Sequence, residues 1–117
     1  MRLSEKLNRL VRRDASAYRQ LVKALSSKRR LAHAQRRAIQ SPLEICEATA
    51  QADQIIAGLS KVAGPYLCSD LKAGRALLKG AFQAASATVD VNLQAKGLRV
   101  GPDGYRRRLH LLRKKIR

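Results

Sequence analysis

Two carboxylates stand at positions where a helical protein could use them for chemistry. The first is Asp70, which follows Ser69 at the start of an Ala-rich segment, residues 68–93, with the composition of a helix. A Ser-Asp pair at a helix start can cap the helix and complement the positive end of its dipole. A carboxylate held beside a substrate can instead move a proton. The residues alone leave both interpretations of Asp70 open.

The second carboxylate, Asp14, interrupts the apolar stripe of the first expected helix, between Leu10 and Tyr18. Burying an unpaired carboxylate is costly. We therefore expect either an ion pair with an arginine such as Arg13 or Arg30, or a side chain that points into a polar groove between helices.

The remaining reactive side chains are scattered. Cys46 and Cys68 lack the spacing of metal ligands. Cys46 also falls on an apolar stripe, which predicts a buried free thiol. His33 and His110 each stand alone, as solvated surface histidines commonly do. The sequence therefore predicts no metal site.

The elements that position these residues are expected to be helices packed as one domain. Of the 117 residues, 45% are hydrophobic but only 3% are aromatic, so the core must consist mainly of Ala, Leu, Ile and Val. Alanine is the strongest helix former, and no segment alternates like a strand. The fold class is all-α: an antiparallel bundle of three long helices and a short basic C-terminal helix.

The helix boundaries follow from caps and breakers. We expect the first long helix over 4–25, and the third between Ser69 and Gly97. The second occupies the segment between them and ends at Gly64-Pro65. Its apolar stripe stays in phase across Pro42, so we expect a kink there.

Small residues dominate the third helix, which we therefore expect to lie in the middle of the bundle. Gly74, Gly80 and Ala84 should make the closest contacts. An Ala-rich core buries little area per residue against the cost of ordering the chain. For this reason we expect a homodimer or higher oligomer.

The C-terminal segment, 98–117, is predicted to be a linker and a basic helix attached to a domain of residues 1–97. Leu109, Leu112 and Ile116 should share one side of that helix. Its cations form the predicted surface for RNA or an acidic protein partner: Arg106, Arg107, Arg108, Arg113, Lys114 and Lys115.

The charge of the chain supports such a partner, because 25 Lys and Arg against 8 Asp and Glu give a net charge of +17. Few aromatic residues are available to stack on nucleic-acid bases, which argues against recognition of single-stranded RNA or DNA. No apolar run approaches the roughly 18 residues of a membrane span, so we expect no membrane partner and a cytoplasmic location.

Four features, taken in order, resemble one known family. They are Asp-Ala-x-Ala-Tyr at 14–18, a helix broken by Pro-Leu at 42–43, Ser-Asp at 69–70, and an Ala-rich helix that ends in Val-Asn-Leu at 91–93. Over residues 7–95 the chain resembles the all-helical family of formiminotransferase-cyclodeaminase and bacterial methenyltetrahydrofolate cyclohydrolases.

The resemblance implies a tetrahydrofolate derivative as substrate and no metal. In a cyclodeaminase a ring nitrogen attacks the formimino carbon and ammonia leaves, whereas in a cyclohydrolase water attacks the methenyl carbon. Both reactions need proton transfer, for which Asp70 is the candidate and Asp14 the second carboxylate. The implied substrate-binding residues are Lys28, Arg30, Ser69 and Asn92, of which Lys28 and Arg30 could hold the glutamate tail.

This sequence also departs from the family pattern. Family members have a Pro-Gly-Gly-Gly-Ser loop that helps to form the folate pocket, and the sequence contains no counterpart of it. We expect that another chain supplies this loop or that the scaffold has been reused as a non-catalytic module.

Overall fold

Four helices make up the fold in the computed structural model, which describes the backbone of residues 2–24 and 28–116 and the side chains of residues 2–20 and 31–116. The helices are α1 (Leu3–Ala24), α2 (Lys28–Ser60), α3 (Pro65–Leu93) and α4 (Asp103–Lys115). The predicted all-α bundle of three long helices and a short C-terminal one is confirmed. No helix within the described residues is long and apolar enough to cross a membrane.

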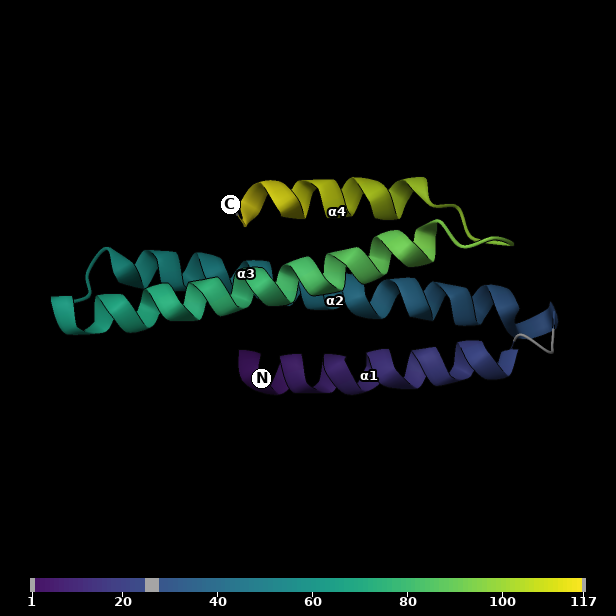
Figure 1. Ribbon diagram of the computed structural model, residues 1–117, viewed down its shortest axis with the longest axis horizontal. Coiled ribbons are helices and arrows are strands. Elements are labelled where there is room, and N and C mark those ends of the chain that lie inside the picture. The colour runs from purple at the N-terminus through teal and green to yellow at the C-terminus, as the bar shows by residue number, and fades with distance from the viewer. Residues whose placement is uncertain (1, 25–27, 117) are drawn as a thin grey trace.

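The central element is α2, against which α1, α3 and α4 all pack. Figure 1 shows α1 along one side of α2, with α3 and α4 on the other. The predicted central position of the third helix is therefore wrong. Small residues allow close approach, but they do not say whether the neighbouring helix belongs to the same chain.

Pro42 lies inside α2, which continues as one helix from Lys28 to Ser60. The stripe that continues in phase across the proline faces the core, where Ile39, Leu43 and Cys46 are fully buried. The helix survives Pro42 because this packed face provides tertiary stabilisation that offsets the lost backbone hydrogen bond.

The core joins α2, α3 and α4. Its buried members are Ile39, Leu43, Cys46, Ala50, Phe82, Ala85, Val89, Leu93, Leu109 and Ile116. As predicted, Leu109 of α4 and Ile116, which caps the C-terminal end of that helix, lie in the core, and Leu112 packs against this cluster. The α4 helix is thus an integral part of the packing on α2.

The linker before α4 is fixed by a glutamine of α2. Gln35 is buried, and its amide donates to the carbonyl of Gly97 at 3.1 Å while its oxygen accepts from the backbone N–H of Arg99 at 2.9 Å. Gly97 has φ of +78°, a conformation that favours glycine. The expected stop at Gly97 is therefore a turn, and α3 itself ends at Leu93.

Candidate functional site

Asp70 and Ser69 lie in the second turn of α3, exposed to solvent. The helix begins at Pro65, with Gly64 as an N-cap that makes no side-chain hydrogen bond. The prediction that Ser69 caps the helix is therefore wrong, because Pro65 is suited to the first helical position and moves the start upstream. Asp70 is not needed as a cap, and its carboxylate faces solvent.

Asp14 is half-buried on α1, and burial raises the pKa of its carboxyl above 3.8. The predicted pair with Arg13 is not formed, because Arg13 donates to Glu44 of α2 at 2.7 Å. The side chain of Arg30, the other partner considered, lies outside the described residues. Tyr18, expected on the same apolar stripe, is 66% exposed, and Ala17 is buried in its place.

Asp14 and Asp70 do not share a groove within one chain. In Figure 1 the start of α3 lies beyond the start of α1, and α1 runs away from that end of the molecule. Asp14 lies eleven residues further along α1 than Leu3, which at about 1.5 Å per residue adds some 16 Å. A single chain therefore does not bring the two carboxylates together.

Of the residues implied in substrate binding, Asn92 has a structural contact. Its side-chain amide donates to the carbonyl of Ala38 at 2.8 Å and so links the end of α3 to α2. Lys28 and Arg30 belong to the first turn of α2, and their side chains lie outside the described residues.

A carboxylate that the sequence reasoning missed is Asp53, which is 2% exposed on α2. Arg75 of α3 donates to it through Nε at 2.9 Å, and this hydrogen bond raises the pKa of the Arg75 guanidinium. Asp53 follows Cys46 and Ala50 at helical spacing, so it interrupts a buried stripe as Asp14 does. A carboxylate within an apolar stripe is a signal that could have identified Asp53 from the sequence. The same signal does not identify Arg75 as its partner.

Cys46 is the predicted buried free thiol. Burial raises the pKa of this thiol to about 12, which keeps it protonated and unreactive. Within the described part of the chain, no group of His, Cys, Asp and Glu side chains could hold a metal ion.

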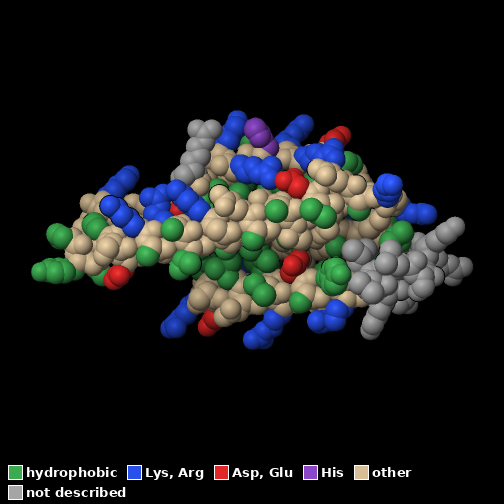
Figure 2. Space-filling model, viewed as in Figure 1, with side chains coloured by type: hydrophobic (Ala, Val, Ile, Leu, Met, Phe, Trp, Pro, Cys, Tyr) green, Lys and Arg blue, Asp and Glu red, His purple; other side chains and the backbone are tan. Residues whose placement is uncertain are grey.

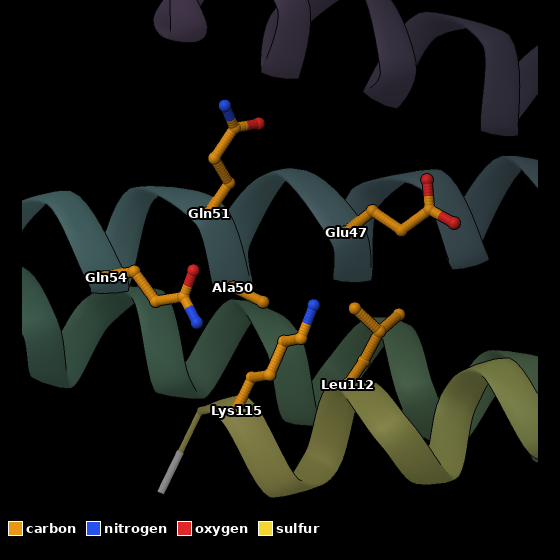
Figure 3. A pocket seen from close by; sticks show the side chains of 6 residues that line it. All are labelled: Glu47, Ala50, Gln51, Gln54, Leu112 and Lys115. Atoms are coloured by element: carbon orange, nitrogen blue, oxygen red, sulfur yellow. The ribbon is translucent and has the colours of Figure 1, made fainter.

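Two open grooves flank α2. One, of about 350 Å³, lies between α2 and α4 and is lined by Glu47, Ala50, Gln51, Gln54, Leu112 and Lys115. Figure 3 shows Lys115 and Gln54 directed toward the space between the two helices, whereas Gln51 points toward α1. The other, of about 540 Å³, lies between α1 and α2. Neither groove includes Asp14 or Asp70.

The cations of α4 have two roles. Arg108 pairs with Glu47 of α2, and Arg113 pairs with Asp90 of α3 at 2.6 Å, so these two hold the helix in place. Arg107, Lys114 and Lys115 are exposed, with no carboxylate partner among the described side chains. In Figure 2 Lys and Arg side chains project from the surface over α4.

In a comparison with known protein families, residues 1–96 match the family model described as formiminotransferase-cyclodeaminase. Searches of curated proteins and of solved structures give no significant match. The family match includes α1, α2 and α3, and α4 lies beyond it. Because it covers most of the sequence, the chain belongs to the formiminotransferase-cyclodeaminase family, a folate-related family.

Proposed function

We propose that the chain acts on the one-carbon unit of a tetrahydrofolate derivative, either as a cyclodeaminase on formiminotetrahydrofolate or as a cyclohydrolase on methenyltetrahydrofolate. The observation that carries the proposal is the family match, which spans both Asp14 and Asp70. The cationic surface of the chain also suits the carboxylates of a folate.

In this proposal Asp70 is the acid and base. Its carboxylate accepts the proton of the attacking amine nitrogen or water and then donates it to the leaving nitrogen. Three features support the assignment: Asp70 is accessible, it has no described ion-pair partner, and the helix start does not require it. Asp14 is the second carboxylate of the proposal, and Lys28 and Arg30 are its candidates for holding the glutamate tail.

A single chain leaves Asp70 open to water, whereas a folate enzyme needs an enclosed site. We therefore infer that the active form is a homodimer or higher oligomer, in which a second chain covers the region around Asp70. The exposed apolar side chains near Asp70, which include Tyr66 at 94% and Leu67 at 58%, favour such a cover.

The test is a titration of the chain with methenyltetrahydrofolate, followed by turnover of the methenyl and formimino derivatives. Asp70→Asn should lower turnover by roughly a hundredfold or more, with folding unchanged because Asp70 is exposed. Asp103→Asn is the matched control, since Asp103 is an exposed carboxylate on α4, outside the family match. Absence of folate binding by the unmodified chain would refute the proposal.

A second candidate function is binding of RNA along α4. It is favoured by the exposed cations Arg107, Lys114 and Lys115, which lack a described carboxylate partner. Contacts of this kind go to phosphates and are independent of sequence.

Affinity for a duplex RNA, measured at several salt concentrations, tests this candidate. Joint replacement of Arg107 and Lys114 by Gln should weaken binding and reduce its salt dependence. Gln replacements of Arg108 and Arg113, whose charges are paired, should have a smaller effect on RNA affinity. Binding of an acidic protein in place of RNA would redirect the interpretation of this surface.

A further inference from the structure

The outward side of α3 is a helical face without Lys or Arg and with a regular spacing. Its residues alternate in steps of four and three along the whole helix, and every one of them is exposed. We call this set the α3 seam: Tyr66, Asp70, Ala73, Leu77, Gly80, Ala84, Ala87 and Val91. Such a four-three repeat is the pattern by which one helix packs lengthwise against another.

No contact among the described residues accounts for the α3 seam, because α3 uses its opposite side for α2, through Phe82, Ala85 and Val89. A Cβ added to Gly80 would meet no atom within 4 Å. Leu77 is 76% exposed and Val91 is 67% exposed. The seam thus exposes the large side chains Tyr66, Leu77 and Val91, with mostly small residues between them.

The charge of the seam indicates what covers it. The chain has 25 Lys and Arg, yet the seam contains none and has Asp70 as its one charge. In Figure 2 Lys and Arg lie mostly above and below the band where Figure 1 places α3. Two copies with a net charge of +17 repel each other, so they can associate closely only through a surface without cations.

We propose that a second copy of this chain docks along the α3 seam with its own seam, antiparallel about a two-fold axis. The axis passes between Leu77 and Gly80, so that Leu77 of each chain packs on the partner's Gly80. This reciprocal contact is the form that a two-fold interface requires. A parallel arrangement would instead place Leu77 on Leu77, Gly80 on Gly80 and the Asp70 carboxylates against each other.

The seam runs from 66 to 91, a length of roughly 40 Å at about 1.5 Å per residue, so the contact extends along most of α3. In the antiparallel register Asp70 lies opposite the partner's Ala87. The second helix would thereby cover Asp70, which is exposed in one chain. This consequence rests on the proposed function, whereas the interface itself does not.

Sedimentation equilibrium tests the interface. The unmodified chain should be a dimer at micromolar concentration, and Leu77→Lys should weaken dimerisation at least tenfold. Leu111→Lys is the matched control, because Leu111 is 52% exposed on α4, away from the seam, and its replacement should leave the dimer intact.

Gly80→Gln tests the interface in a second way. The variant should dissociate the dimer without destabilising the fold, so misfolding cannot explain the result. In the monomer it should raise the thermal midpoint, because glycine is unfavourable inside a helix and the added side chain meets nothing. It should nevertheless dissociate the dimer, because the partner's Leu77 needs that space. A monomeric unmodified chain, or a dimer unaffected by both variants, would overturn the proposal.

Orientation is tested by cysteine cross-linking in a Cys68→Ser background. Chains carrying Leu77→Cys should cross-link with chains carrying Gly80→Cys, and each variant alone should cross-link poorly. Strong cross-linking of Leu77→Cys with itself would contradict the antiparallel arrangement. A dimer that binds no folate would leave the interface standing and refute only the proposed function.

Discussion

The two halves of α3 differ in how the chain holds them. The C-terminal half is buried through Phe82, Val89 and Leu93, and it is linked to its neighbours by Asn92 and by the pair of Asp90 with Arg113. The N-terminal half, from Pro65 to Gly80, contains no fully buried residue. There the described polar contact to α2 is the ion pair of Arg75 with Asp53.

The difference separates two roles within one helix. Because α4 packs beside the C-terminal half, that part contributes to the core. The N-terminal half carries Asp70 and extends past the end of α4 in Figure 1. Both halves carry part of the α3 seam that a second chain would cover, but only the N-terminal half carries Asp70. The half that stabilises the monomer is therefore not the half proposed for function.

The largest expected difference between the halves comes from matched leucines. Leu93→Ala removes a side chain that is 4% exposed and should lower the free energy of unfolding by about 2–5 kcal/mol. Leu67→Ala removes one that is 58% exposed in a single chain and should change the free energy of unfolding of the monomer by no more than about 0.5 kcal/mol. Urea titrations measure the free energy of unfolding of both variants. Equal decreases would contradict the proposed difference between the two halves of α3.

Replacing Arg75 by Met should lower the free energy of unfolding somewhat less than Leu93→Ala does. The change leaves the buried Asp53 carboxylate without its partner, which should cost about 2–3 kcal/mol. Arg113→Met breaks an ion pair whose two side chains are 46% and 42% exposed, so it should cost at most about 1 kcal/mol. If the two variants lose the same stability, Asp53 is not the anchor of the N-terminal half.

The smallest expected effect concerns the pH dependence of stability. Burial raises the pKa of Asp14, so the folded chain binds this proton more tightly than the unfolded chain does. The contribution of Asp14 to the free energy of unfolding is therefore fully present below pH 3.8. It is lost as the pH rises through the raised pKa of the folded chain.

Asp14→Asn should remove this part of the pH dependence. At neutral pH it should stabilise the chain by less than about 1 kcal/mol, because Asp14 is only half-buried and solvent screens its charge. Thermal midpoints measured from pH 3 to pH 8 check this, with Asp70→Asn as the exposed comparison. A destabilised Asp14→Asn chain at neutral pH would indicate that Asp14 has an ion-pair partner.

The sequence by itself determined the helices, because helix formation depends on local properties. Alanine content, the break at Gly64-Pro65 and the in-phase stripe across Pro42 all act over a few residues. The same periodicity correctly placed Leu109 and Ile116 toward the core and Cys46 among buried residues. The residues that resemble the family were also enough to predict it, and the match over 1–96 confirms this.

Only the tertiary structure decided which surfaces meet. A row of small residues looks the same in sequence whether it packs within the chain or faces outward, so α2 rather than α3 proved central. The pairing of Asp53 with Arg75 joins residues 22 positions apart, and Asn92 contacts a residue 54 positions away. Such contacts depend on how helices are placed in space, which local periodicity does not specify.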